Sequence, residues 1–200
     1  MTIVIYIVKA RERAEGHMRV SREKAAENRQ KIVDVAARLF REHGFDGVGV
    51  DAIMKEAGLT HGGFYGHFGS KDELASEAVT TALQRGNEKM SRFTKLRSYV
   101  AAYLSDRHCA DRGDGCGLAA LGADIPREGA AVRRAITVYV AARLDWIAGL
   151  FGGAAVSRRK RAIAALSGMI GALTLARAVD DPALSKEILA AAREAFGKAG

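Results

Sequence analysis

The sequence predicts an all-α protein in which a small N-terminal three-helix unit precedes a larger helical domain. Three observations support this fold class. Apolar residues recur at helical spacing along most of the 200 residues. No stretch of any length alternates apolar and polar residues as a half-buried strand does. The composition, 48% apolar with 6% aromatic residues and two prolines, suits alanine-rich helices.

The first predicted helix spans residues 21–43. Gly44 follows it, and a glycine directly after a helix closes it in the left-handed conformation. The apolar residues of this helix fall at i, i+3, i+4, i+7 and i+8, with Arg and Glu opposite: Ile32, Val35, Ala36, Leu39 and Phe40. We expect this helix to be the packing base of the N-terminal unit.

A helix-turn-helix is predicted at about residues 49–68. Gly49 caps the first short helix, which we expect to start at Val50. Gly58 ends it with a sharp turn, because glycine enters the left-handed conformation without steric cost. One apolar stripe of this two-turn helix consists of Ile53, Met54 and Ala57.

The second helix of this motif is predicted to begin at His61. The hydroxyl of Thr60 is placed to accept hydrogen bonds from the next turn and so to cap it. Three glycines each cost roughly 0.5–1 kcal/mol relative to alanine inside a helix, so we expect a weakly formed element. They are Gly62, Gly63 and Gly66; the aromatic residues beside them are Phe64, Tyr65 and Phe68.

The chain beyond the motif is divided at residue 86 into an N-terminal unit, 21–86, and a C-terminal domain, 87–200. Ser70 and Glu73 have capping-box spacing and start a helix that is expected to end near Gly86. A polar, glycine-rich loop is predicted at 106–117. The remaining predicted helices span residues 91–105, 118–125, 127–151, 157–179 and 184–196.

The stretch from Gly44 to Leu74 resembles the DNA-binding signature of the TetR family of transcription regulators. The resemblance covers about a quarter of the chain and departs from the usual residues at Gly49, Gly66 and Gly69. The matching residues are Gly44-Phe45, Val50, Ile53, Ala57-Gly58-Leu59-Thr60, Gly62, Phe64-Tyr65, His67-Phe68 and Ser70-Lys71.

The resemblance implies which residues meet DNA. Tyr65, His67 and Lys71 match positions that hold phosphates, although Tyr65 and His67 alternatively only pack. Thr60 and His61 are expected to give modest base readout, and the backbone approaches DNA at Gly62 and Gly63. Phe64 and Phe68 are assigned to the core.

Net charge alone does not indicate DNA binding. The chain carries +8, but residues 21–74 hold eight Lys or Arg against nine Asp or Glu. Residues 1–20 form an N-terminal extension whose charged part follows its apolar part, the reverse of a signal peptide. Two readings stay open: translation from Met18, or an arm that contacts DNA through Arg11, Arg13 and Arg19.

The C-terminal domain offers a candidate cavity and a candidate dimer interface. The effector pocket is predicted from aromatic and polar residues at Tyr99, Tyr103, Tyr139, Arg143, Trp146 and Met169; for most of these the simpler alternative is core packing. The dimer interface is predicted from a small-residue face at Ala164, Ser167, Gly168, Gly171 and Ala172. The resemblance implies a four-helix bundle formed by the last two helices of each protomer.

The loop at 106–117 suggests a second kind of switch. Cys109 and Cys116 are the two cysteines of a chain without a convincing secretion signal, so a reducing cytoplasm is expected. Inert thiols are the simplest reading, and thiol or metal sensing is the alternative. The spacing matches no established zinc pattern. We predict no metal and no cofactor.

The sequence therefore predicts a cytoplasmic regulator that is not an enzyme, since no HExxH or GxSxG motif occurs. No apolar run reaches the roughly 20 residues that span a membrane. The predicted partners are a second copy of the chain, double-stranded DNA with a pseudo-palindromic operator, and a small-molecule effector. The resemblance implies repression that the effector relieves.

Overall fold

The computed structural model describes the backbone of residues 2–90 and 92–198, and the side chains of residues 21–90 and 92–198. Every regular element within these ranges is a helix, so the all-α fold class is confirmed. The elements are α1 (Thr2–His43), α2 (Val50–Glu56), η1 (His61–Gly66), α3 (Lys71–Met90), α4 (Leu96–Tyr103), α5 (Asp106–Ala110), α6 (Gly117–Leu121), η2 (Ile125–Arg127), α7 (Ala130–Gly149), α8 (Ala155–Ala178) and α9 (Pro182–Gly197).

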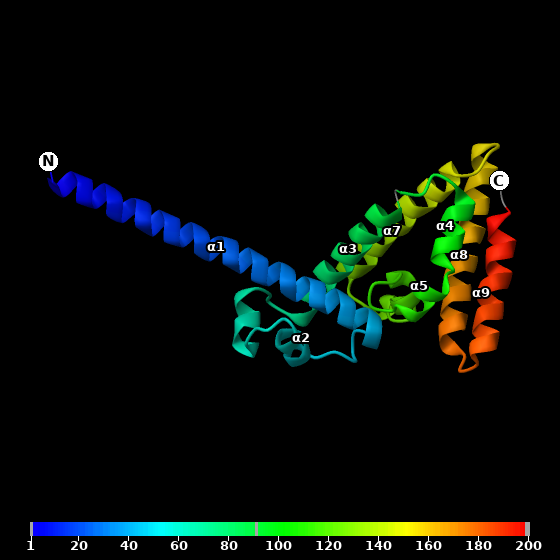
Figure 1. Cartoon of the computed structure of the whole chain (residues 1–200), viewed down its shortest axis with the longest axis horizontal. Coiled ribbons are helices and arrows are strands. Elements are labelled where there is room, and N and C mark those ends of the chain that lie inside the picture. The colour runs from blue at the N-terminus through cyan, green and yellow to red at the C-terminus, as the bar shows by residue number, and fades with distance from the viewer. Residues whose placement is uncertain (1, 91, 199–200) are drawn as a thin grey trace.

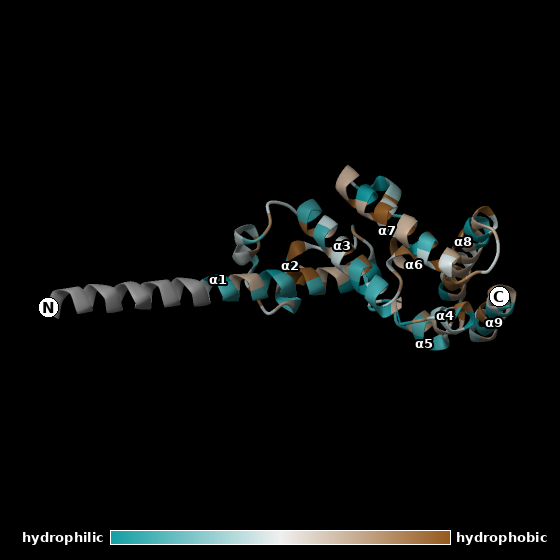
Figure 2. Ribbon diagram, turned by 90° about the horizontal axis from the view of Figure 1, so that it is seen from above, coloured by the Kyte–Doolittle hydropathy of each residue, from teal (hydrophilic) through white to brown (hydrophobic). Residues whose placement is uncertain are grey.

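The N-terminal unit is built on α1. Helix α1 packs against α2 and α3, and α2 packs against the 3₁₀ helix η1. Figure 2 shows hydrophobic residues of α2 lying against α1. The side chains that are fully buried in this core include Ile32 and Phe40 of α1 and Ile53 of α2, so the apolar stripes predicted for both helices are confirmed.

The C-terminal domain is a layered helical bundle. Helix α7 packs against both α3 and α8, and α9 packs against α8 and α4. In Figure 1, α8 and α9 lie side by side at the end of the molecule opposite the free end of α1. The core of this domain gathers Leu104, Ile147, Met169 and Leu173.

The N-terminal core extends into the C-terminal domain. Leu121 of α6, Ile125 of η2 and Tyr139 of α7 belong to the same buried cluster as Phe40 and Leu74. A second cluster fills the space among α4, α7, α8 and α9. The two halves of the chain are therefore joined by shared packing, which lets a change in one half strain the other.

Several helix boundaries differ from the expected ones. Helix α3 continues through Gly86 to Met90, because tertiary packing against α7 outweighs the low helix propensity of one glycine. The helix expected at 91–105 is the shorter α4, which Lys95 precedes in an extended conformation. The expected end of α1 at Gly44 is confirmed, with φ of 77° and an amide that donates to Phe40 O.

The region from residue 106 to 127 is more ordered than the predicted loop. Its first part forms α5, and the Ser105 hydroxyl caps this helix by accepting from the His108 amide. The irregular loop is thus reduced to residues 111–116. The single helix expected at 118–125 is two elements, α6 and η2, and Pro126 lies within η2.

Helix α8 is long enough, and just apolar enough, to span a membrane by composition alone. Its buried face, however, packs against α7 and α9 in the C-terminal core. This is how a core helix of a helical bundle behaves, and the helix also begins with the basic run Arg158-Arg159-Lys160-Arg161.

Candidate DNA-binding site and ligand cavity

The turn between α2 and η1 has the geometry that the sequence predicts. Gly49 caps α2 in an extended conformation. Gly58 has φ of 68°, and its amide donates to Lys55 O while the Leu59 amide donates to Met54 O. These two bonds form a Schellman motif, which redirects the chain from α2 into η1.

The second helix of the motif differs from the expected one. It begins at His61 as predicted but is a 3₁₀ helix, and Thr60 precedes it without the predicted side-chain capping bond, so the capping expectation is wrong. The Gly63 amide instead donates to Thr60 O, three residues back. Three glycines in six residues weaken the α-helical alternative, and the tighter helix keeps its i→i+3 bonds over this short span.

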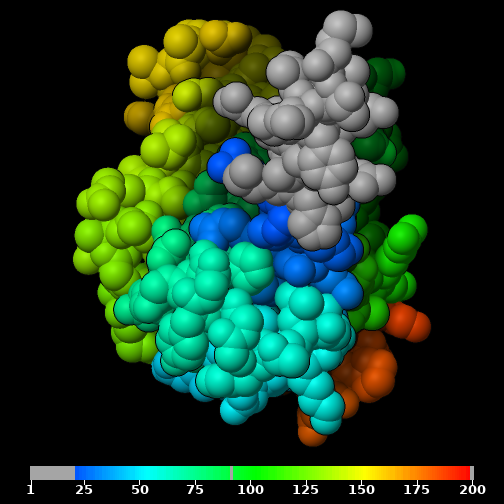
Figure 3. Space-filling view, turned by 90° about the vertical axis from the view of Figure 1, so that its left-hand side faces the viewer, coloured from blue at the N-terminus to red at the C-terminus, as the bar shows by residue number. Residues whose placement is uncertain are grey.

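The aromatic residues of η1 divide between the core and the surface. Phe64 and Phe68 are buried and stack with ring centroids 5.6 Å apart. Tyr65 is 67% exposed, with its ring edge against Phe64. Anchored on two buried rings, η1 presents its other side to solvent. Figure 3 shows this segment on the surface, in cyan, below the grey atoms.

The exposed side of η1 carries most of the residues predicted to contact DNA. Thr60, His61, Gly62 and Tyr65 are exposed, and Gly63 is partly so. A Cβ built on Gly62 would meet nothing within 4 Å. His61 Nδ1 contacts the Asp51 carboxylate, which links the start of η1 to α2. The backbone is therefore open to close approach along this edge.

Lys71 and His67 are placed differently from these exposed residues. Lys71 Nζ donates to Phe45 O at 2.6 Å and is only partly exposed. His67 is also partly buried, and its carbonyl accepts from the guanidinium of Arg29. Both residues lie at the end of η1 and the start of α3, beside the Ser70 cap whose hydroxyl accepts from the Glu73 amide at 3.1 Å.

Arg29 is a residue of this site that the sequence did not reveal. Its guanidinium lies 4.0 Å from the centroid of the Phe68 ring and pairs with Glu77 of α3. It therefore connects α1 to α3 and to the residues that directly follow η1. Only its place on the polar side of α1 is visible in the sequence, and that place is typical of any solvated arginine.

A cavity of about 230 Å³ lies in the C-terminal domain where the two cores meet. Four of the six residues predicted to line an effector pocket line it: Tyr99, Tyr103, Tyr139 and Arg143. Trp146 lies outside it, with its ring centroid 5.0 Å from that of Tyr99, and Met169 of α8 is fully buried in the C-terminal core. Gly86 and Phe93 also line the cavity and were not predicted.

His108 closes one side of this cavity as a neutral ring. The Cys116 amide donates to Nε2 at 2.9 Å, so the proton resides on Nδ1, which donates to Tyr103 O at 2.5 Å. Burial lowers the pKa of His108, because the charged ring would be desolvated and the nearby Arg177 repels it. Protonation of Nε2 would break the bond to Cys116.

The two cysteines lie near this histidine as free thiols. Both are partly buried, and Cys116 lines the cavity. Arg177 of α8 donates to Cys109 O at 3.1 Å and to His108 O at 2.7 Å. Among the described residues no group of three possible metal ligands comes together.

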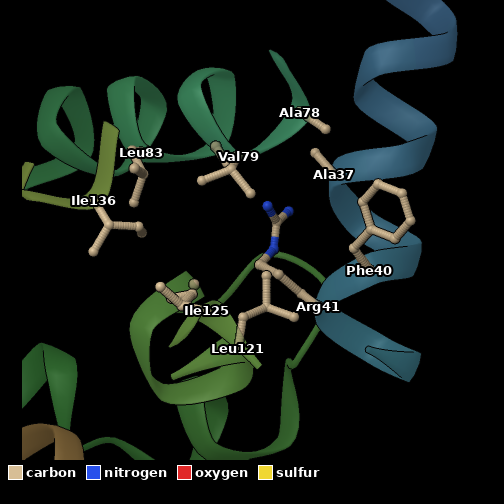
Figure 4. Close-up of a pocket in the computed structure, with 11 residues that line it drawn as sticks. Ala37, Phe40, Arg41, Ala78, Val79, Leu83, Leu121, Ile125 and Ile136 are labelled. Atoms are coloured by element: carbon tan, nitrogen blue, oxygen red, sulfur yellow. The ribbon is translucent and has the colours of Figure 1, made fainter. Parts of the chain in front are cut away.

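The loop at 111–116 connects this cavity to α1. Arg41 of α1 donates from Nε to Gly113 O at 2.6 Å. Figure 4 shows the Arg41 side chain reaching from α1 between Val79 of α3 and Leu121 of α6. Asp114 and Cys116, which follow in the same loop, line the cavity. A shift of this loop therefore acts directly on α1.

The residues predicted for a dimer interface do not share one environment. Ala164 and Ser167 are exposed, and Gly171 has open space at its Cβ position. Ala172 is buried within the protomer, and a Cβ on Gly168 would lie 2.0 Å from the Phe196 ring of α9. Gly168 thus serves the packing of α8 on α9. The exposed face of these helices also carries Ile163, Leu175 and Leu184.

A recognition element that is exposed on a small helical unit, with a larger helical domain next to that unit, is the arrangement of a helix-turn-helix protein. Residues 32–78 match the family model described as bacterial regulatory proteins, tetR family. The N-terminal unit of this chain is therefore similar to the DNA-binding unit of the TetR family of transcription regulators. The resemblance that the sequence suggested is thus confirmed.

The relatives place the strongest similarity in part of the chain. HTH-type transcriptional regulator LmrA of Bacillus subtilis is 35% identical over 88 residues, which cover 42% of this chain and 47% of LmrA. The chain thus spans about half the length of this curated relative.

Solved structures extend the likeness to the whole fold. A TetR-family regulator from Cytophaga hutchinsonii matches with a TM-score of 0.72 at 18% identity, covering 86% of this chain and 94% of that one. NemR of Escherichia coli, in its reduced form, matches with a TM-score of 0.69 at 18% identity, covering 85% and 95%. Identities this low show a shared fold.

Proposed function

We propose that this chain is a transcriptional repressor that binds a pseudo-palindromic operator as a homodimer. The observation that carries the proposal is the exposed edge of η1, supported from behind by Phe64 and Phe68, in a chain whose N-terminal unit matches the family model. This edge offers backbone and a tyrosine hydroxyl to DNA, so phosphate contacts supply much of the affinity. A regulatory, non-catalytic role in the cytoplasm is in keeping with the family.

Tyr65 and Lys71 are proposed as the main phosphate ligands. Tyr65 is already exposed, whereas Lys71 must exchange its bond to Phe45 O for a phosphate oxygen. That exchange is feasible because a flexible ammonium group forms a charge-assisted bond with phosphate. Thr60, His61, Gly62, Gly63 and His67 complete the proposed contact edge.

The dimer is proposed to form through the exposed faces of α8 and α9. Ile163, Leu175 and Leu184 are 46%, 58% and 41% exposed on these helices in the single chain. A two-fold axis there would bury the apolar side chains and leave both N-terminal units free. Two recognition elements would then reach successive major-groove faces, which requires two related half-sites.

A small-molecule effector in the cavity is proposed to release the DNA. The cavity shares Asp114 and Cys116 with the loop whose Gly113 accepts from Arg41. An effector that prefers a shifted loop would move α1 and change the separation of the two reading units. It must bind the released state more tightly, because only differential affinity shifts the equilibrium.

The test is fluorescence anisotropy on DNA fragments tiled across the upstream region of the gene, with random DNA as competitor. The proposal predicts one fragment bound tightly at two protomers per site, and Tyr65→Ala should reduce that affinity. Only weak binding, with no preference for any fragment, would contradict it. The control Val138→Ala removes another exposed side chain, on α7, and should bind normally.

A thiol-responsive switch is the second candidate, because Cys116 lines the cavity and its amide bonds to His108. Oxidation at Cys116 would disturb the same loop that contacts Arg41. Replacing both cysteines with serine separates the mechanisms. Peroxide-triggered release that survives in the double variant would eliminate the thiol mechanism.

A further inference from the structure

Arg143 is a buried cation for which the described residues offer no carboxylate partner. Its side chain lies on α7 with 4% of the residue exposed and lines the cavity. Nη2 donates to the Tyr139 hydroxyl, and the guanidinium lies 4.9 Å from the centroid of the Tyr139 ring. Nη1 is buried without a hydrogen-bond partner. No carboxylate among the described residues forms an ion pair with it.

This arrangement costs folding free energy. Arginine remains charged in proteins, and a buried charge requires a partner to offset its lost hydration. A tyrosine ring and one hydroxyl offset only part of that loss. A guanidinium also presents a planar fork of donors that matches a carboxylate with two parallel bonds. The free edge of Arg143 is therefore suited to an anion with two oxygens.

Two further donors line the same cavity. The Tyr99 hydroxyl is buried without a hydrogen-bond partner among the described residues, and the buried Tyr103 hydroxyl has the Cys116 thiol, a weak acceptor, beside it. Burial raises the pKa of both tyrosines, so they stay neutral O–H groups and can donate to an anion. His108 cannot serve as a second cation, because its neutral form is the one that accepts from the Cys116 amide.

The rest of the wall is apolar. Leu83, Met90 and Phe93 line the cavity, and the Phe93 ring lies 6.0 Å from the Tyr99 ring. The cavity volume of about 230 Å³ exceeds the roughly 150 Å³ of an engineered cavity that holds benzene. One aromatic ring with a short charged substituent fits this space.

We propose that the cavity binds a small organic monoanion, an aromatic or similarly compact apolar carboxylate, with Arg143 as its anchor. The proposal rests on the proposed effector function of this cavity and names the class of effector. A dianion such as a phosphate monoester is disfavoured, because Arg143 is the buried cation of the lining. Lys89, the other cation there, is exposed and lies 3.9 Å from Asp114.

The chain contains its own optical probe for this binding. Trp146 is the single tryptophan of the sequence, and its ring contacts Tyr99 of the cavity wall edge-on. Titrations with benzoate and with benzamide, a neutral molecule of nearly the same shape, are followed by Trp146 fluorescence. Saturable binding of benzoate, at least about tenfold tighter than that of benzamide, is expected from a charge-assisted pair.

Three variants assign the preference to Arg143. Arg143→Met keeps the length of the side chain and removes the charge, so benzoate should lose its advantage over benzamide. Arg143→Lys keeps the charge but not the fork, and should retain a reduced preference. Arg134→Met changes an exposed arginine of the same helix and should bind as the wild type does. Thermal unfolding by circular dichroism shows whether each variant is folded.

The proposal is overturned if benzamide binds wild-type protein as tightly as benzoate, or if benzoate fails to bind. A benzoate preference that persists in folded Arg143→Met overturns it as well. If Arg143→Met does not fold, an Arg143→Lys variant that prefers benzoate over benzamide as strongly as the wild type does also overturns the proposal. DNA anisotropy on the same samples distinguishes this proposal from the proposed repressor function. Specific DNA binding without benzoate binding would contradict only the proposed class of ligand. Benzoate binding without specific DNA binding would contradict only the proposed repressor function.

Discussion

The two ends of this molecule expose and bury their polar groups in opposite ways. The edge of η1 leaves backbone and a tyrosine at the surface over two buried phenylalanines. Its glycines have no side chains to cover that backbone. The C-terminal cavity does the reverse, because it buries Arg143, one of whose nitrogens lacks a hydrogen-bond partner among the described residues, and the hydroxyls of Tyr99 and Tyr103. An open edge suits a large polyanion that arrives from outside, while buried donors suit a small ligand that is enclosed.

The largest expected effect distinguishes a residue that supports the fold of the N-terminal unit from one that contacts DNA. Phe64→Ala removes a ring that is 1% exposed and stacked on Phe68, so the free energy of unfolding should fall by about 3–5 kcal/mol. Its neighbour Tyr65 is 67% exposed, and Tyr65→Ala should change that free energy by under about 0.5 kcal/mol while weakening DNA binding. Urea unfolding measures both. Equal losses would show that Tyr65 serves packing.

The connection between the two ends is tested at Arg41. Arg41→Met removes the bond to Gly113 O but keeps an apolar chain between Val79 and Leu121. Benzoate should still bind, and its effect on DNA affinity, commonly about 5–150-fold in coupled systems, should be lost. Parallel fluorescence and anisotropy titrations check this. Unchanged release in the variant would place the coupling elsewhere, for example in the shared core at Leu121 and Ile125.

The pH dependence of the free energy of unfolding tests whether His108 is held neutral at the cavity. Burial lowers the pKa of His108 below its ordinary 6.5, so the unfolded chain takes up this proton first as the pH falls. Stability should be unaffected by His108 above pH 6.5 and should decrease from there toward the lowered folded pKa. Urea unfolding at pH 7.5 and 5.5 is compared with that of His108→Gln, in which the decrease should be smaller. An identical pH profile would mean that His108 is not held neutral.

The smallest expected effects come from a pair of glycines. Gly86→Ala in α3 places a Cβ at ordinary contact distance, 3.6 Å from the Tyr139 hydroxyl, and should add about 0.5–1 kcal/mol of stability. Gly62→Ala meets no neighbour, but it puts a methyl group on the proposed DNA edge. DNA affinity should therefore fall for Gly62→Ala alone. Equal DNA affinity in both variants would argue against close backbone approach at Gly62.

The sequence revealed the N-terminal unit because its signals are local. Gly44 and Gly58 mark helix ends within one or two residues, and each adopts the positive φ that such an end requires. The same local reasoning wrongly predicted a capping bond from the Thr60 hydroxyl. It also did not indicate that η1 is a 3₁₀ helix. Propensity indicated a weak helix there, but the choice between two weak helices depends on the packing of Phe64 and Phe68.

The cavity was only partly predictable because its lining comes from α3, α4, α5, α6, α7 and the segments that connect them. Periodicity places Tyr99 and Tyr139 on inward faces but does not say which inward residues border empty space. Trp146 and Met169 have the same pattern and are packed behind the wall or in the core. Gly86 and Arg41 carry no sequence signal for their roles, since both depend on contacts with distant elements.

The measurement that tests the central claim most directly is hydroxyl-radical footprinting of the fragment that binds most tightly. A dimer that reads DNA through the edge of η1 predicts two protected patches related by a pseudo-two-fold axis. Their centres should be separated by about 10–10.5 base pairs or a multiple of that spacing. Both patches should fade together in Tyr65→Ala. A single patch, or uniform protection along the fragment, would contradict the account.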